Sequence, residues 1–198
     1  MNFVQPIRDP MVIEGIKEYM KIRSLRNYLF FCFGIYSGLR VSDLRMLQAG
    51  MVRGTHVNIK ERKNRNRKRF IIHPSIRGDL HRYIANMADD DFLFPSRQAK
   101  KKTKMKLQPF DRSTAYKMLN HAARQFGLRE IGCHTMRKTW GYQLYIQDPR
   151  NLALLMEMYG HSDPSITLRY IGMTQDMMDA AIIRLSTPQL GRNRTHFL

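Results

Sequence analysis

The stretch YLFFCFGIYSGLRVSDL, residues 28–44, determines how the chain begins to fold. Its apolar part, residues 28–36, is too short to span a bilayer and reads as protein core, with Cys32 inside it. Ser24 is suited to cap the start of a helix over residues 24–38, and Gly38 is suited to end it. A buried helix is therefore predicted, followed by a short helix over residues 41–48 that starts next to Arg40.

Helical spacing dominates on both sides of this stretch. Residues 51–73 differ, because two β-capable runs flank a basic turn there and Pro74 follows, which predicts a hairpin. Residues 89–111 contain prolines and lysines with little apolar periodicity and read as an exposed loop. Further helices are predicted over residues 11–22, 75–87, 112–126, 134–146, 150–159, 163–171 and 176–186. The last of them carries one apolar stripe, made of Met178, Ala181, Ile182 and Leu185. The predicted class is mainly α with a small antiparallel β-hairpin (α+β).

The charge balance predicts a polyanionic partner. The chain holds 34 Lys and Arg against 16 Asp and Glu, a net charge of +18, with a pI near 10.4. Nucleic acid is the first candidate and an acidic membrane surface the second. Two cysteines make neither a disulfide framework nor a metal quartet, and no signal peptide is recognisable, so a cytoplasmic protein without metal or cofactor is expected.

Four stretches carry side chains suited to chemistry: SGLRVSDL, KERKNRNRKRF, GCHTMRKTWGYQLY and GHSDPSITLRYIG. Together they supply two arginines, a lysine, two histidines and a tyrosine, namely Arg40, Arg137, Lys63, His134, His161 and Tyr170. Each also has an ordinary structural interpretation. Arg40 and Asp43 could form a surface ion pair worth ~0.2–0.5 kcal/mol, His134 could cap its helix, and Tyr170 could be core. The hairpin could simply contact phosphates.

Taken together, this set of side chains suits phosphoryl transfer. That reaction needs cations on the non-bridging oxygens, an in-line nucleophile and a proton for the leaving oxygen. Guanidinium groups match phosphate and stay charged, tyrosine can attack, histidine can take the phenolic proton, and lysine can protonate the departing 5′ oxygen. No carboxylate or Cys/His cluster points to a metal, so side chains must supply the cations.

These segments resemble the catalytic domain of the tyrosine recombinases, the phage integrase family. SGLRVSDL looks like the first arginine box, HTMRKT like the His-x-x-Arg second box, and YGHSDPSITLRYI like the closing segment that holds the nucleophile. DDDFLFPSR resembles a stretch common between hairpin and second box. Asp43 stands where the family often has Glu, and Lys138 stands where His is frequent. The likeness covers roughly residues 10–186.

The resemblance implies a role for each of these positions. Arg40, Arg137 and His161 would hold the scissile phosphate, and Asp43 would support Arg40. His134 would be general base or phosphate contact, and Tyr170 the nucleophile of a 3′-phosphotyrosyl bond. Lys63 would be the general acid, although Lys60 or Lys68 could take that role. The phosphate-contacting residues expected on the hairpin and the basic loop are Arg62, Arg65, Arg67, Lys68, Lys100, Lys101, Lys102 and Lys104.

The implied partner is double-stranded DNA, with four protomers assembling on it, a weak oligomer or monomer without it, and no membrane. A single catalytic domain over residues 1–186 is expected, with a tail over residues 187–198 and without the N-terminal core-binding domain of the family. Whether residues 176–186 fold onto their own domain or dock into a neighbour stays open. Two alternatives to recombination remain: topoisomerase-like nicking and closing, and a catalytically idle accessory DNA-binding protein.

Overall fold

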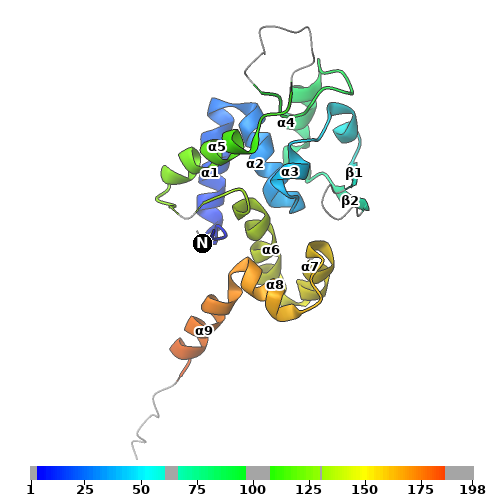
Figure 1. Cartoon of the computed structure of the whole chain (residues 1–198). Helices are drawn as coiled ribbons and strands as arrows, with labels where there is room; N and C mark the ends of the chain where they lie inside the picture. The colour runs from blue at the N-terminus through cyan, green and yellow to red at the C-terminus, as the bar shows by residue number, and fades with distance from the viewer. Residues whose placement is uncertain (1–3, 61–66, 97–107, 130, 186–198) are drawn as a thin grey trace, which may run out of the picture.

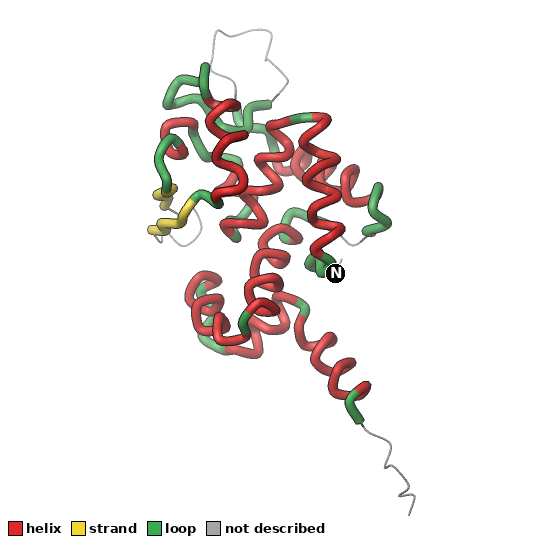
Figure 2. The backbone as a smooth tube through the Cα atoms, turned by 180° about the vertical axis from the view of Figure 1, so that it is seen from behind, coloured by secondary structure: helices red, strands yellow, loops and turns green. Residues whose placement is uncertain are grey.

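The computed structural model describes residues 4–60, 67–96, 108–129 and 131–185 (Figure 1). Its helices are α1 (Pro10–Arg23), α2 (Leu25–Ser37), α3 (Val41–Leu44), α4 (Pro74–Ile84), α5 (Arg112–Arg124), α6 (Thr135–Gln147), α7 (Leu152–Tyr159), α8 (Pro164–Ile171) and α9 (Met173–Ile183). The strands are β1 (His56–Lys60) and β2 (Arg67–Ile71). Short 3₁₀ turns cover Ala49–Val52 and Pro149–Asn151. The predicted class, mainly α with one small antiparallel hairpin, is confirmed (Figure 2).

The ends of α1 and α2 follow from their capping residues. The Asp9 carboxylate accepts from the Met11 N–H at 2.8 Å, and Pro10 occupies the first helical position. The Ser24 hydroxyl oxygen accepts from the Asn27 N–H, and Gly38 ends α2 with φ 62°. The cap and the stop predicted for the helix over residues 24–38 are both confirmed.

The helix predicted over residues 41–48 is shorter in the structure. It ends at Leu44, and the chain then pairs with a segment far along the sequence. The Leu47 carbonyl accepts from the Leu93 N–H at 2.7 Å, and the Ala49 N–H donates to the Asp91 carbonyl at 2.9 Å. Arg45, Met46 and Leu47 still donate to carbonyls three or four residues earlier, but the long-range bonds of Leu47 and Ala49 take the chain away from the helical path.

The prediction of an exposed loop over residues 89–111 is wrong for several of the residues that the structure describes. Leu93, Phe94 and Phe110 are buried in the main core. The Phe110 N–H donates to the Phe94 carbonyl at 3.0 Å and the Ser96 N–H to the Gln108 carbonyl at 2.7 Å. This short ladder closes the base of the segment. Residues 97–107 lie outside the described part of the chain.

Two hydrophobic clusters organise the fold. The larger lies among α1–α5 and the start of α6, and it includes Cys32 and the ring of Phe30, which packs edge-on against Phe94 and Phe110. The smaller, made of Trp140, Leu155, Tyr159, Ile171 and Met173, joins α6 to α7, α8 and the start of α9. Helix α6 runs from the larger group of helices down to α7 and α8 (Figure 1).

Helix α9 begins at Met173, immediately after the left-handed Gly172 that ends α8. Met173 is buried, whereas the predicted stripe residues Met178, Ile182 and Leu185 are exposed. Figure 1 shows α9 pointing away from the other helices. Within the described residues, no helix is both long and apolar enough to cross a membrane.

Candidate active site

Arg137 is held by the ends of two other helices. It lies in the first turn of α6 and is only 4% exposed. Its Nη1 donates to the Gly38 carbonyl at 2.5 Å, its Nη2 donates to the Met158 carbonyl at 3.3 Å, and its Cζ lies 4.6 Å from the Tyr159 ring centre. The guanidinium is therefore fixed between the end of α2 and the end of α7.

His134 occupies the N-cap position of α6 but does not cap it. Its side chain makes no capping hydrogen bond, and its Nδ1 lies 3.3 Å from the Tyr170 hydroxyl. The interpretation of His134 as a helix cap is thus wrong. Loss of solvent around the imidazole lowers the pKa of His134, and Arg112, Arg137, Lys138 and Arg40 lower it further. A neutral imidazole next to a phenol can accept its proton.

Tyr170 is half-buried on α8, facing the site. Its ring packs edge-on against Tyr159 at 4.9 Å and against His161 at 5.7 Å. Burial raises the pKa of Tyr170, and the nearby Arg137 and Arg40 oppose that rise. The phenol is therefore protonated at neutral pH, so a base is needed to activate it as a nucleophile.

His161 follows Gly160, whose left-handed conformation (φ 73°) ends α7. The His161 Nδ1 lies 3.0 Å from the Thr167 hydroxyl. When that hydroxyl donates to Nδ1, the Nε2 carries the ring proton and can donate to a ligand oxygen. Burial lowers the pKa of His161, and so do Arg137 and Arg40.

Arg40 occupies the N-cap position of α3, two residues after Gly38, and its side chain makes no capping hydrogen bond. Its charge lowers the pKa values of His134, His161 and Tyr170, so it belongs to the same cluster as those three side chains. Asp43 lies one turn further on and is 6% exposed, so its carboxylate is buried beneath the surface.

The hairpin reaches this cluster through Lys68. Its Nζ donates to the Met158 carbonyl at 2.7 Å, the same oxygen that Arg137 contacts. Lys60 ends β1, and Arg67 is exposed on β2. The other predicted hairpin and loop residues, Arg62, Lys63, Arg65, Lys100, Lys101, Lys102 and Lys104, lie outside the described residues.

The assembled site can bind and attack a phosphodiester. Two arginines and a lysine give positive charge, two neutral histidines can donate or accept protons, and one phenol lies within reach of one of them. The N-terminus of α6 adds the positive end of its helix dipole. Where the structure describes the chain, no group of three or more His, Cys, Asp or Glu residues is placed to hold a metal ion.

Residues not foreseen from the sequence complete the site. Tyr159 packs between Arg137 and Tyr170, and Lys138 lies with its Nζ 5.3 Å from the Tyr170 ring centre. Burial lowers the pKa of Lys138, and so does Arg8. The only available signal for Tyr159 was its position directly before Gly160 and His161, where an aromatic residue reads equally well as core.

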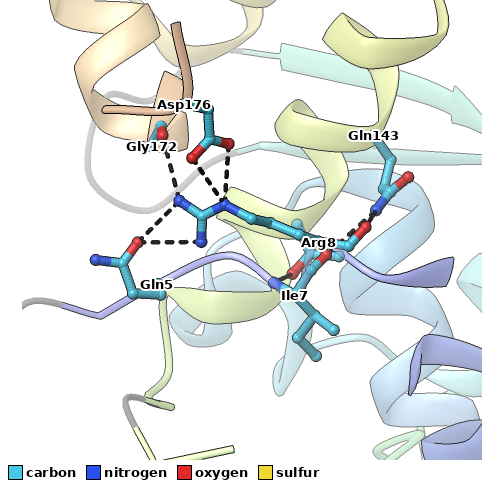
Figure 3. Close-up of polar contacts among 7 residues, drawn as sticks. Gln5, Ile7, Arg8, Gln143, Gly172 and Asp176 are labelled. Atoms are coloured by element: carbon cyan, nitrogen blue, oxygen red, sulfur yellow. Dashed lines mark hydrogen bonds and ion pairs between the residues drawn. The ribbon is translucent and has the colours of Figure 1, made fainter. Parts of the chain in front are cut away.

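Residues 5–8, ahead of α1, make hydrogen bonds to α6, to the end of α8 and to α9 (Figure 3). The Ile7 N–H donates to the Thr139 hydroxyl at 2.8 Å, and Gln143 donates to the Ile7 and Arg8 carbonyls. Arg8 forms an ion pair with Asp176 at 2.9 Å and donates to the Gly172 carbonyl at 3.3 Å. This network fixes the α8–α9 junction, two residues after Tyr170.

The fold and this arrangement can be compared with known proteins. The family model described as "Phage integrase family" matches residues 9–176. The chain is 38% identical over 182 residues to the probable integrase/recombinase YoeC of Bacillus subtilis (strain 168), covering 91% of this chain and 96% of the relative. It is 24% identical over 196 residues to a tyrosine recombinase of Pseudothermotoga lettingae, covering 90% of this chain and 65% of that relative.

Solved structures share the fold. XerA recombinase superposes with a TM-score of 0.69 at 18% identity, covering 93% of this chain and 65% of that chain. The catalytic domain of bacteriophage HP1 integrase superposes with a TM-score of 0.56 at 14% identity, covering 92% of this chain and 96% of that domain. The chain therefore belongs to the phage integrase family and is an enzyme with the catalytic domain of a tyrosine recombinase.

Proposed function

We propose that this enzyme cleaves and rejoins double-stranded DNA at specific sites by moving a DNA strand onto Tyr170. The observation that carries the proposal is the 3.3 Å separation between the Tyr170 hydroxyl and His134 Nδ1, inside a cluster of arginines. The DNA-bound relatives fit it: XerH is a site-specific recombinase bound to a difH substrate, and lambda integrase is bound to a core site.

In the first half of the reaction, the Tyr170 oxygen attacks the phosphorus and its proton passes to His134. The P–O5′ bond breaks, and the 3′ phosphate stays on Tyr170 as a phosphodiester. Arg40, Arg137 and the Nε2 of His161 bind the non-bridging oxygens and stabilise the charge that develops there. One phosphodiester replaces another, so the reverse attack by a 5′ hydroxyl rejoins a strand without ATP.

The leaving 5′ oxygen needs a proton, and we assign its donation to the hairpin, with Lys63 as first candidate. Lys68 is the second candidate, because its Nζ already shares the Met158 carbonyl with Arg137. In a substrate whose bridging 5′ oxygen is replaced by sulfur, the 5′ strand end leaves as a thiolate and needs no proton. Such a substrate should restore cleavage to the alanine variant of the true general acid and not to Arg137→Ala. If it restores cleavage to neither Lys63→Ala nor Lys68→Ala, neither lysine is the general acid.

DNA contacts beyond the scissile phosphate are proposed on the hairpin and the basic loop, at Arg62, Arg65, Arg67, Lys68, Lys100, Lys101, Lys102 and Lys104. Each phosphate neutralised releases counterions, so the affinity for DNA should fall steeply as the salt concentration rises.

The exposed apolar residues Met178, Ile182 and Ile183 of α9 support assembly with a neighbouring protomer, and we propose a tetramer on DNA.

The test is to incubate the protein with total DNA from its source, denature it, digest it, and search by mass spectrometry for nucleotide-modified Tyr170. Tyr170→Phe should lose the adduct while keeping its DNA affinity, and Tyr116→Phe, an exposed tyrosine of α5, should keep both. An adduct with supercoil relaxation but no exchanged product would indicate nicking and closing. DNA binding without any adduct would indicate an accessory protein and would overturn the proposal.

A further inference from the structure

Tyr159 is a buried tyrosine that the proposed chemistry does not use, yet it lies against three of the side chains proposed to carry out that chemistry. It is the last residue of α7 and is 4% exposed. Its ring centre lies 4.6 Å from the Arg137 Cζ, 4.9 Å from the Tyr170 ring centre and 5.3 Å from the His161 ring centre. A single rigid ring therefore borders the arginine, the nucleophile and the histidine.

The Tyr159 hydroxyl fixes that ring in place. It donates to the Arg137 main-chain carbonyl at 2.8 Å, so Tyr159 contacts Arg137 at both its backbone and its guanidinium. Burial raises the pKa of Tyr159, which keeps the hydroxyl protonated and available as a donor. Trp140 also packs edge-on against this ring, with 5.6 Å between the ring centres.

Helix α6 is shaped to admit this hydroxyl. A Cβ at Gly141 would clash with the Tyr159 oxygen and would lie 2.9 Å from Ile171 Cγ2, in the residue that follows Tyr170. Gly141 thus leaves room for the hydroxyl of Tyr159. The same absence of a side chain lets α8 approach α6 beside the nucleophile.

We infer that Tyr159 is a positioning residue that holds the Arg137 guanidinium and the Tyr170 ring in the geometry for strand cleavage. The inference rests on the proposed function of Tyr170. The face of the Tyr159 ring attracts the Arg137 guanidinium, and the same ring limits how the Tyr170 ring can turn. The Tyr159 hydroxyl fixes this ring by its hydrogen bond to the backbone of α6. Leucine would fill much of the volume and supply none of these three restraints.

The two substitutions Tyr159→Phe and Tyr159→Leu separate the hydroxyl from the ring. Single-turnover formation of the Tyr170–DNA adduct should slow by no more than about tenfold in Tyr159→Phe, the scale of one hydrogen bond. It should slow by about 10²-fold in Tyr159→Leu, since small misplacements of reacting groups have effects of that order. The DNA dissociation constant should change little in either variant.

The chain offers a control tyrosine, Tyr83, which is partly buried and also makes a hydrogen bond. Like Tyr159, Tyr83 on α4 donates its hydroxyl to a backbone carbonyl, that of Leu93 at 2.9 Å, but it packs against the larger hydrophobic cluster, whereas Tyr159 belongs to the smaller one. Tyr83→Phe and Tyr83→Leu should lower stability without slowing adduct formation by folded protein. Equal slowing by Tyr83→Leu and Tyr159→Leu would overturn the inference, because a general loss of packing would then explain both.

A double substitution tests the fit between Tyr159 and Gly141. Gly141→Ala should slow cleavage by displacing the Tyr159 hydroxyl, and Tyr159→Phe should relieve part of that effect because the clashing oxygen is gone. The combined variant should therefore be faster than the product of the two separate effects predicts. Strictly multiplicative effects would mean that the two positions do not constrain each other.

A readout without DNA keeps the inference separate from the proposed function. NMR can follow the chemical shifts of the histidine rings in the free protein as the pH changes. The shifts of His161 and His134 should differ from wild type in Tyr159→Leu and match wild type in Tyr83→Leu. If the wild-type enzyme forms no adduct, the proposed function fails, and with it the cleavage role of Tyr159. Unchanged histidine signals together with unchanged cleavage would refute the positioning role alone.

Discussion

Replacing Gly38 with alanine should destabilise the fold and displace Arg137 in the candidate active site. Gly38 ends α2 with φ 62° and ψ 17°, and its carbonyl accepts from Arg137. A Cβ there would lie 2.6 Å from Trp140 Cδ2 and closer still to Cε3. Trp140 is 8% exposed and packs against Tyr159, so its ring has little room to retreat.

The expected loss of stability has two parts. A left-handed conformation costs an ordinary residue about 1–2 kcal/mol, and overpacking a closed site costs about 1–3 kcal/mol. The lower entropy of alanine in the unfolded chain returns about 0.4–1 kcal/mol. We expect a net loss of about 2–4 kcal/mol, a large share of the 5–15 kcal/mol (roughly) by which such domains are stable.

Two other glycines separate these contributions. Gly127 has φ 73° but no atom within 4 Å of its would-be Cβ, so Gly127→Ala should lose only about 1 kcal/mol through strain. Gly78 lies inside α4, also with nothing within 4 Å, and Gly78→Ala should gain up to about 1 kcal/mol.

Urea unfolding followed by circular dichroism measures all three variants, and adduct formation reports whether Arg137 has moved. Gly38→Ala should be the least stable and should also slow cleavage, because the Gly38 carbonyl holds the guanidinium. A loss equal to that of Gly127→Ala would refute the reasoning, since the Trp140 ring would then contribute nothing.

Two further predictions concern charge. The pKa values of His134, His161 and His73 are lowered in the folded protein, chiefly by desolvation, so the unfolded chain binds more protons below the ordinary histidine pKa of about 6.5. Stability should therefore be full above that pH and fall as the pH drops toward 5, and a melting temperature constant over that range would contradict the shifts. For Arg8 and Asp176, a double-mutant cycle of alanine variants in urea should give a coupling of only about 0.5–1 kcal/mol, because the side chains are 37% and 27% exposed. A coupling of zero would show that the pair does not anchor α9.

Local signals in the sequence were enough for most of the fold. Ser24 and Gly38 mark the ends of α2 because capping depends on residues that are neighbours in the chain. The helix over residues 41–48 was overextended because its competitor, the Leu93 N–H that bonds to the Leu47 carbonyl, lies far along the chain. Leu93 and Phe94 were assigned to an exposed loop because the stretch around them contains prolines and lysines and has little apolar periodicity.

The site was only partly predictable for the same reason. Arg40, His134, Arg137, His161 and Tyr170 could be proposed because their residue types and order suit one reaction, and the structure brings them together. What each of them does stays a prediction.

The supporting contacts gave no such signal. Tyr159 reads as ordinary core until its ring is seen between Arg137 and Tyr170. Lys68 reads as one basic residue among many until its contact with the Met158 carbonyl is known.

The ladder that joins Ser96 to Gln108 has a use in protein engineering. Because the 2.7 Å bond between them, and the one from Phe110 to Phe94 behind it, brings the two ends of the intervening segment together, that segment can be treated as a replaceable cassette. Doubling its length costs only about 0.6 kcal/mol in closure entropy. Sequences of different length and composition could thus be exchanged there to test the DNA contacts proposed for this segment, without altering the aromatic core that the ladder adjoins.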